Sequence, residues 1–326
     1  MRVSVGTFNL NNLFSRFNFQ AKVDAKPSKK EGGITVTFGT DDVAVRTFKG
    51  NLVKEKSAAA TAKIARRITD EVDADVLAVQ EVEHIEILRK FNRDQLGGLY
   101  PHVALIEGND ARLIDVGILS KLPIGRITSH QTAVHPDDPN RRVFGRDLLE
   151  VEILDPQGKR KLFTVYNTHM KSHFVPRTED QAEGKKKADA RRKRQAETIS
   201  KIISANERQG GKFILLGDMN DPPKSEFLEP MLMVDGRPLT NALAGAIETR
   251  PPKPESPNQG PGPRSPVWTH RYDPPGPGTF PEYELYDHVW LSEGLAPALQ
   301  SAHIDRRKNH GGDGSDHDPA WVVLDV

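Results

Sequence analysis

The chain has 326 residues, with 46 basic residues against 45 acidic ones and no cysteine. Its balanced charge neither favours nor excludes a polyanionic partner, which only a local patch of charge could attract. The lack of cysteine excludes disulfides, thiolate metal sites and cysteine nucleophiles, so a bound metal must use Asp, Glu, Asn or His and would be a hard cation such as Mg²⁺, Mn²⁺ or Ca²⁺.

Short runs of β-branched and other apolar residues recur along the chain and predict strands, because most are bounded by Gly, Pro, Asp or Asn. They cover residues 2–8, 75–82, 115–120, 148–154, 161–169, 212–218, 286–292 and 320–326. Residues 56–72 and 185–207 carry apolar side chains at helical spacing and predict helices. The mixed order of hairpin-like pairs, helices and strands predicts an α/β fold with two sheets packed face to face and helices outside.

We expect one domain over residues 1–326, since no boundary would leave two independent cores. Two insertions interrupt it. Residues 26–50 resemble a hairpin on a polar loop, and residues 250–281 hold 11 of the 24 prolines, which predicts a long surface loop. Within that loop, Trp268 and Tyr272 stand out as aromatic residues that could pack over a neighbour or stack on a base.

No apolar run is long enough to span a bilayer. The first residues, "MRVSVGTFNL", alternate apolar and polar side chains, unlike a secretory signal. We therefore expect a cytoplasmic protein without a membrane anchor, and a secreted form whose signal was removed stays open. No obligatory protein partner is indicated.

Polar side chains stand at the tips of most predicted strands. They are Asn9, Asn11, Glu81, Asn167, His169, Asp218, Asn220, Asp287, Asp316 and His317. If these tips meet at one edge, they form an acidic cup that holds two imidazoles. Glu81 and Asp316 could hold a divalent cation, which would polarise a phosphoryl oxygen. One histidine could act as the base for water and the other could assist the leaving oxygen.

Each residue also has an ordinary interpretation when taken alone. Asn9 and Asn220 fit turns or strand ends, and His169 fits a hydrogen-bonded, half-buried histidine. Glu81 is harder to explain in this way, because an unpaired carboxylate in a buried strand is costly. The combination is more specific than any of its members.

These residues resemble the motifs of the endonuclease/exonuclease/phosphatase superfamily, which includes the DNase I-like nucleases. The motifs follow in family order as "FN", "QE", "NTH", "GDxN", an aspartate before a strand, and "SDH", over residues 7–322. The resemblance implies a DNase I-like four-layer α/β sandwich, in which two packed mixed β-sheets are flanked by helices. It also implies a metal-dependent phosphoester hydrolase and is strongest toward bacterial nuclease-like members.

The resemblance implies a metal site and a catalytic histidine. Glu81 resembles the main metal ligand of the family, and Asn9 and Asp316 resemble further metal-associated residues. His317 resembles the catalytic histidine, with Asp287 as the carboxylate that orients it.

The resemblance also implies residues that contact the phosphate. His169 resembles the histidine that touches the scissile phosphate, and Asp218 and Asn220 resemble the pair that orients water and phosphate. The family carboxylate that supports the first histidine has no clear match, although Asp110 lies in the right interval. The predicted substrate-binding residues are Asn11, Arg146, Asn167, Lys171, Arg194 and Gln195.

Three features bear on the substrate. "DPP" after Asn220 replaces the residues that mark inositol phosphatases, whereas Lys171, Arg194 and Gln195 match the nuclease-like members. The basic run 185–195 could track a phosphate backbone or form a solvated helix face. We predict a Mg²⁺-dependent phosphodiesterase, with nucleic acid as its substrate. A phosphodiesterase or phosphatase for a lipid or small phosphoester is the alternative.

Overall fold

The computed structural model describes residues 1–15, 47–48, 51–52, 55–176, 178–248, 263, 265–272, 278–307 and 314–326. Most of the insertion expected at residues 26–50 lies outside this part, as does much of the proline-rich segment 250–281. At the end of the first insertion, β2 (Thr47–Phe48) pairs antiparallel with β3 (Asn51–Leu52).

Two large mixed sheets form the centre of the described structure. The first has the order β16 (Ile247–Glu248), β20 (Leu299–Ile304), β21 (Ala320–Asp325), β1 (Arg2–Leu13), β4 (Val76–Val82), β6 (Asp115–Ser120) and β5 (His102–Leu105). The second has the order β15 (Thr240–Asn241), β19 (Asp287–Leu291), β12 (Phe213–Asp218), β11 (Lys161–His169), β10 (Leu148–Leu154) and β7 (Ile124–Ser129).

Shorter pairs of strands lie at the margins. They are β8 (Val134–His135) with β9 (Asp138–Arg142), β13 (Met233–Val234) with β14 (Arg237–Pro238), and β17 (His270–Tyr272) with β18 (Glu282–Glu284).

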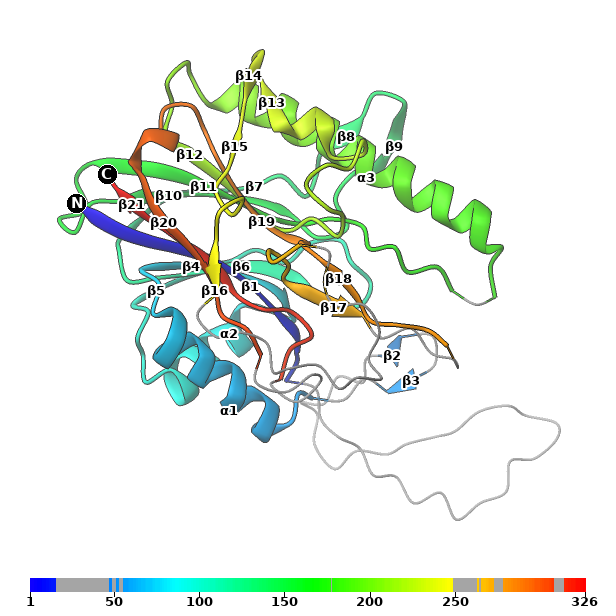
Figure 1. Cartoon of the computed structure of the whole chain (residues 1–326), viewed down its shortest axis with the longest axis horizontal. Helices are drawn as coiled ribbons and strands as arrows, with labels where there is room; N and C mark the ends of the chain where they lie inside the picture. Colours follow the sequence, from blue (N-terminus) through cyan, green and yellow to red (C-terminus); the bar gives the residue numbers. More distant parts are fainter. Residues whose placement is uncertain are drawn as a thin grey trace.

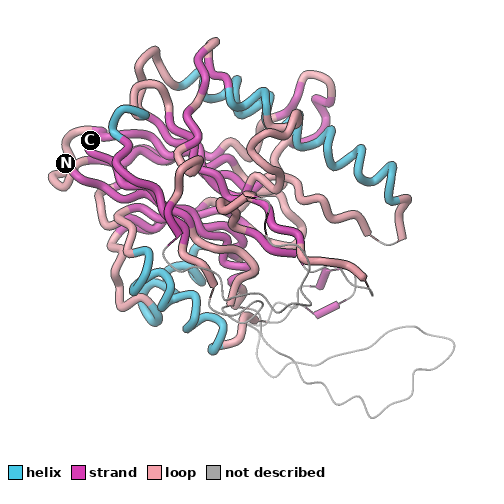
Figure 2. Tube along the Cα trace, in the orientation of Figure 1, coloured by secondary structure: helices cyan, strands magenta, loops and turns pink. Residues whose placement is uncertain are grey.

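Helices cover the outer face of each sheet (Figures 1 and 2). On one side lie α1 (Ala58–Arg66), which continues as a π-helical turn, η1 (Arg67–Val72), and α2 (Ile85–Gln95). On the other side lies α3 (Gln181–Asn206), and two short 3₁₀ turns, η2 (Glu229–Leu232) and η3 (Ala296–Ala298), complete the elements. This confirms the predicted four-layer α/β sandwich. None of the described helices has the length and apolar character needed to cross a membrane.

Strand β1 shows why so many strands read as apolar on both faces. Val3 and Val5 point into the core between the two sheets, whereas Phe8 and Leu10 point into the layer under α1 and α2. Since successive side chains of a strand alternate between its faces, a central strand of a four-layer fold buries both sets.

The N-terminus of α3 is capped by a side chain. The side chain of Asp180 accepts a hydrogen bond of 2.8 Å from the backbone N–H of Glu183, which satisfies one of the free amides of the first turn. The helix begins four residues before the predicted stretch, and α2 is a helix that the sequence pattern did not predict.

Gly217 occupies a position that only glycine can fill, and it directly precedes Asp218. Its φ is +127°, and an added Cβ would lie 2.0 Å from the carbonyl oxygen of Thr168 on the neighbouring strand β11. The close approach holds β11 and β12 together at the end where polar residues gather.

We expect Gly217→Ala to lower the free energy of unfolding by about 3 kcal/mol, because it combines backbone strain with a clash against a main-chain oxygen. Urea unfolding measures this change. Gly245→Ala is the matched control, since an added Cβ there meets no atom within 4 Å. It should alter stability by less than about 0.5 kcal/mol. Equal effects of the two substitutions would contradict the packing argument.

Candidate active site

Three predicted site residues form a row across the ends of neighbouring strands. His169 at the end of β11 pairs in register with Asp218 at the end of β12, and Asp218 pairs in register with Asp287 at the start of β19. Side chains at directly opposed positions of a sheet point to the same face. The three side chains are therefore brought together by strand register alone.

The first sheet reaches this row through a hydrogen bond. Asn9 on β1 donates from Nδ2 to Oδ2 of Asp218, 2.9 Å away, and both side chains are almost fully buried. The other carboxylate oxygen of Asp218 accepts from the backbone N–H of Asn220 at 2.9 Å. Asp218 thus lies at the junction of the two sheets, and burial raises its pKa to about 7 against the opposing pull of His317.

His317 lies over this row from the loop before β21. Its Nδ1 is 2.7 Å from Oδ2 of Asp287, and its Nε2 is 3.8 Å from Oδ2 of Asp218. The short contact fixes a proton on Nδ1 and leaves Nε2 directed at the cup. Burial lowers the pKa of His317, but Asp287, Asp218 and Asp316 more than offset this and hold the pKa well above its ordinary value.

The second histidine has the opposite electrostatic character. His169 Nε2 lies 3.3 Å from Oδ2 of Asp218, and burial, with the positive charges of Arg146 and Arg112, holds the pKa of His169 well below its usual value. Among the described residues, its buried Nδ1 has no hydrogen-bond partner. His169 is therefore a neutral ring beside a carboxylate.

Arg146 supplies a buried positive charge near His169. Its Nη1 donates to the carbonyl of Met170 at 3.1 Å, and its Nε lies 3.1 Å from Oδ2 of Asp110. Burial lowers the pKa of Arg146 to about 10, while Asp110, Glu81 and Asp218 act in the opposite direction. Asp110, which lies in the interval of the family carboxylate that supports the first histidine, holds Arg146.

Two of the predicted metal ligands, Glu81 and Asp316, attract the charge of the same ammonium group, that of Lys56. The backbone of Glu81 at the end of β4 has a φ of 61°, and its carboxylate accepts from the N–H of Asn12 at 3.0 Å. Lys56 donates to the carbonyl of Asn11 at 2.5 Å; burial lowers its pKa, whereas Asp316 and Glu81 attract its charge. Two carboxylates from different parts of the chain thus act on one cation, so the donor set of this corner fits a hard metal ion.

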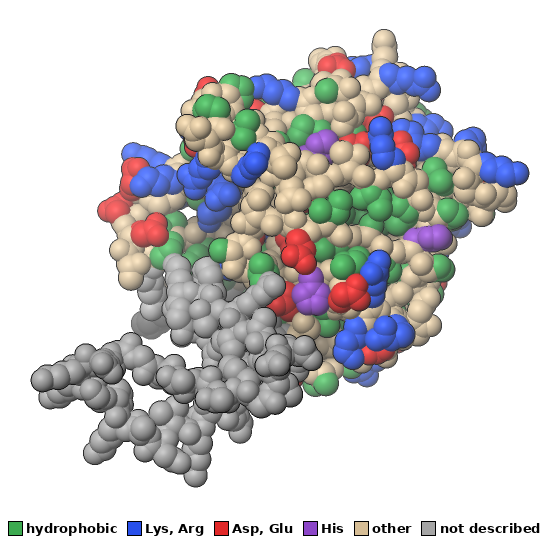
Figure 3. Space-filling view, turned by 180° about the vertical axis from the view of Figure 1, so that it is seen from behind, with side chains coloured by type: hydrophobic (Ala, Val, Ile, Leu, Met, Phe, Trp, Pro, Cys, Tyr) green, Lys and Arg blue, Asp and Glu red, His purple; other side chains and the backbone are tan. Residues whose placement is uncertain are grey.

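Two groups of side chains have donor atoms close enough to share a metal ion. They are His270 with Asp316 and His317, and Asp218 with Asp287 and His317; the atoms in each lie within 4.8 Å of one another. On the face seen in Figure 3, acidic and histidine side chains gather at one place with Lys and Arg beside them. Within the described residues, Glu81 belongs to neither group.

Sequence comparison places the chain in a family. The model of the Endonuclease/Exonuclease/phosphatase family matches residues 6–317. The chain belongs to this family. Its members are phosphoester hydrolases, so phosphoester hydrolysis is the class of reaction that the family indicates for this chain. No curated protein matches the sequence.

Solved structures share the fold at low identity. A family member from Bacteroides vulgatus has a TM-score of 0.58 and 15% identity and covers 100% of this chain and 99% of its own. The mannosyl-6-phosphatase of Bacteroides thetaiotaomicron VPI-5482 has a TM-score of 0.55 and 14% identity, covering 99% and 100%. The Neisseria 3′ phosphatase NExo, bound to a product DNA hairpin, has a TM-score of 0.52 and 15% identity, again covering 99% and 100%.

Asn167 is not part of the cup. Its side chain is fully buried between the sheets, where its Nδ2 donates to the carbonyls of Val79 and Gly117 and its Oδ1 accepts from Gln80. Both N–H donors of the amide are used, so neither is left for a phosphate oxygen. The prediction that Asn167 binds substrate is therefore corrected to a structural role in joining the sheets.

Gln195 also acts through the backbone. It is buried on α3, where its Oε1 accepts from the N–H of Lys171 at 3.0 Å and its Nε2 donates to the carbonyl of Val143 at 3.3 Å. Gln195 therefore holds the Lys171 loop, which corrects its predicted contact with substrate. Arg194, one residue before it, faces Asp138 at 3.9 Å and lies to the side of the cup.

The two asparagines that flank the cup are held by local bonds. The side-chain Oδ1 of Asn11 accepts from Asn12 at 2.9 Å, and its backbone is left-handed. Asn220 is also left-handed, and its Nδ2 donates to the carbonyl of Met170 at 3.2 Å. The amide of Asn9 is engaged at both ends, by Asp218 and by the N–H of Asn11.

His270, which no sequence pattern indicated, lies beside His317 and comes from the proline-rich insertion. Its ring centre lies 4.7 Å from that of His317 and 5.0 Å from that of Tyr286. Burial and the charge of His317 lower the pKa of His270 to about 4. The sequence "PVWTHRY" was the one signal that could have pointed to His270. In the same segment, Trp268 is almost fully buried over Arg306, so it cannot stack on a base.

We expect Asp287→Asn to lower the pKa of His317 by at least about one unit, because the substitution removes the nearest negative charge. Titration of the imidazole ¹⁵N signals measures this shift. His303, whose pKa burial and Arg2 lower, reports from another part of the protein and should titrate as before. An unchanged pKa of His317 would contradict the contact with Asp287.

Proposed function

We propose that the protein is a divalent-metal-dependent phosphodiesterase that cleaves DNA or RNA, with His317 and Asp287 at its centre. The observation that carries the proposal is the 2.7 Å contact between these residues directly over Asp218. A histidine held by a carboxylate on one nitrogen and open on the other has the form required for proton transfer to or from water.

In the molecules whose His317 ring is neutral, the free Nε2 takes up the proton of the attacking water, because Asp287 keeps a proton on Nδ1. The carboxylates around the ring favour its protonated form, so it retains that proton while the ester bond breaks. Asp218, held by Asn9, and Asn220 orient the water and the phosphate. His169 and Arg146 contact the phosphate oxygens, the first as a neutral donor and the second as a buried charge.

Glu81 and Asp316 would hold the cation, which we propose to be Mg²⁺, with Mn²⁺ or Ca²⁺ as alternatives. Bound there, it would offset negative charge on the phosphoryl group. Asn11 stays a proposed substrate contact, and its backbone carbonyl accepts a hydrogen bond from Lys56. Asn9 is not retained as a metal ligand, because its amide serves Asp218 and the turn at Asn11.

The positive side of the cup supports a nucleic-acid substrate. Arg146 and Lys171 lie together, and burial with the charge of Arg146 lowers the pKa of Lys171 to about 8. Such crowded cations favour an anionic ligand. A phosphomonoester is the second candidate, because both the mannosyl-6-phosphatase and the 3′ phosphatase share this fold.

A panel of substrates tests the proposal in Mg²⁺ and in Mn²⁺. It contains plasmid DNA, single-stranded DNA, RNA, bis-p-nitrophenyl phosphate, p-nitrophenyl phosphate and sphingomyelin. We expect cleavage of the nucleic acids and of the diester. Activity confined to p-nitrophenyl phosphate would favour the monoesterase, and activity confined to sphingomyelin would reject a nuclease.

His317→Ala should lower kcat on the best substrate by about 10²–10⁴-fold, the usual contribution of a positioned acid or base. Steady-state kinetics at saturating metal measure it. His102→Ala, on β5 at the margin of the first sheet, should leave kcat unchanged. A loss of less than tenfold for His317→Ala would rule out the proposed proton transfer.

Excess EDTA should abolish hydrolysis, and added Mg²⁺ or Mn²⁺ should restore it, because the proposed cation is held by oxygen ligands. Glu81→Gln should raise the metal concentration for half-maximal activity at least about tenfold, since it removes a charged ligand. A metal titration of initial rates measures both effects. Full activity in EDTA would exclude the metal-dependent mechanism.

A further inference from the structure

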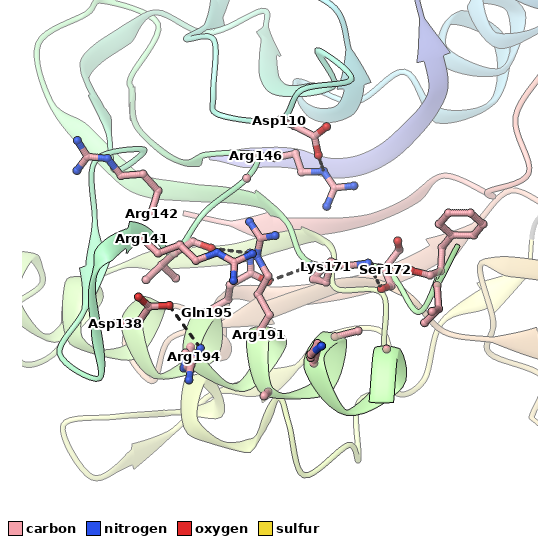
Figure 4. A pocket seen from close by; sticks show the side chains of 18 of the residues that line it. Asp110, Asp138, Arg141, Arg142, Arg146, Lys171, Ser172, Arg191, Arg194 and Gln195 are labelled. Carbon is pink, nitrogen blue, oxygen red and sulfur yellow. Dashed lines mark hydrogen bonds and ion pairs between the residues drawn. The ribbon is translucent and has the colours of Figure 1, made fainter. Parts of the chain in front are cut away.

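A basic cavity of about 600 Å³ opens beside the candidate active site. Its walls come from α3, from the β8–β9 hairpin and from the loops that carry Arg146 and Lys171 (Figure 4). Eight basic residues line it against three acidic ones. The mechanism proposed above uses only the edge of this space, so most of its positive charge has no assigned role.

The walls of the cavity are tied to each other. Nε2 of His135, on the hairpin, lies 2.9 Å from Oε2 of Glu197 on α3. Asp138, at the start of β9, faces Arg194 at 3.9 Å. The hairpin is thus fixed against the helix, and the cavity between them is a built feature of the fold.

Two guanidinium groups in the cavity form no ion pair with any residue that the structure describes. Arg141 on β9 and Arg191 on α3 point toward each other (Figure 4), and neither makes an ion pair within the described part of the chain. Burial and the charge of Arg141 lower the pKa of Arg191. Two like charges held face to face favour the binding of an anion between them.

The pair of arginines lies next to the catalytic phosphate site in space. A Cβ placed on Gly145 would be 3.2 Å from Nη2 of Arg191, and Gly145 directly precedes Arg146. The positive charge is therefore continuous from Arg146 to Arg191 and Arg141. A chain of phosphates matches such a path, whereas one isolated phosphate would occupy only one end of it.

An exposed aromatic residue stands at the rim of the same cavity. Phe174 is 69% exposed, and its backbone carbonyl accepts from Nζ of Lys171 at 3.1 Å. A large apolar ring that is held beside a row of cations, and is not buried, has the form used to stack on a nucleobase.

We propose that this cavity binds a second phosphate of the nucleic-acid strand, one that neighbours the scissile phosphate, between Arg141 and Arg191. Phe174 stacks on a base of the same strand. This inference rests on the proposed function and defines the substrate as a strand with at least two phosphates. Guanidinium groups suit this role because they bind phosphate oxygens in pairs. Holding a phosphate that does not react positions the one that does.

The test compares Arg141→Ala/Arg191→Ala with a control that loses the same charge elsewhere. The control is Arg89→Ala/Arg93→Ala on α2, where both side chains are more than half exposed. All variants carry His317→Ala, so that a fluorescein-labelled single-stranded oligonucleotide remains intact, and its binding is followed by anisotropy over a range of salt. Thermal melting verifies that each variant is folded.

We expect the cavity variant to bind the oligonucleotide at least tenfold more weakly than its His317→Ala parent and than the control. The slope of log Kd against log salt should fall by about 0.7 for each phosphate contact removed. Phe174→Ala should weaken binding about fivefold or more without changing that slope, since stacking involves no charge. Equal affinities and slopes for the cavity variant and the control would overturn the inference.

A kinetic arm in the active protein separates this inference from the proposed function. The ratio of kcat/KM for the oligonucleotide to kcat/KM for bis-p-nitrophenyl phosphate should fall at least tenfold in Arg141→Ala/Arg191→Ala. An equal loss on both substrates would assign the arginines to the scissile phosphate and reject a second site. If the oligonucleotide binds through the arginines but is not cleaved by the active protein, the proposed function fails and the second phosphate site stands. If the oligonucleotide does not bind the His317→Ala parent, the second phosphate site fails.

Discussion

The buried carboxylate of Asp218 is the constraint on which the rest of the site depends. A carboxylate without water costs several kcal/mol unless hydrogen bonds replace its hydration. Here one bond comes from Asn9 on the first sheet and one from the backbone of Asn220 beside the second sheet. Both sheets must therefore pack in a single register for the charge to be satisfied. The end of the sandwich that carries the candidate site is fixed by the same contacts that join its two halves.

The two histidines differ because their surroundings differ, although both lie near Asp218. Burial and arginines lower the pKa of His169, whereas three carboxylates raise the pKa of His317. A buried ion network holds the His317 loop: Arg67 donates to Oδ2 of Asp305 at 2.9 Å and to the carbonyl of His317 at 3.3 Å. Such a separation of pKa values within one pocket assigns different tasks to chemically identical rings.

The fold and the row of His169, Asp218 and Asp287 could be predicted from the sequence, because polar residues directly follow or precede clear apolar strands. Asn167 was misassigned for a simple geometric reason. It lies two residues before His169, on the same face of β11 but about 6–7 Å deeper in the sandwich, where it meets Gln80 and not the cup. A strand pattern gives the face of a residue but not its depth. His270 was missed because a long insertion carries no periodicity from which its position could be predicted.

The basic run 185–195 shows what packing adds to a charge pattern. On the sequence alone its cations surround the helix. In the structure, Arg192 is fully buried, with its Nε 3.2 Å from Asp221, and this removes it from any surface. Lys187, Arg191 and Arg194 are spaced i, i+4 and i+7, which places them on one stripe, and this stripe lines the cavity. A solvated face and a face proposed to bind phosphate can therefore both exist on α3. On the face of α3 that is turned toward the β8–β9 hairpin, Arg141 of the hairpin lies across the cavity from Arg191. A phosphate held between two arginines requires this arrangement.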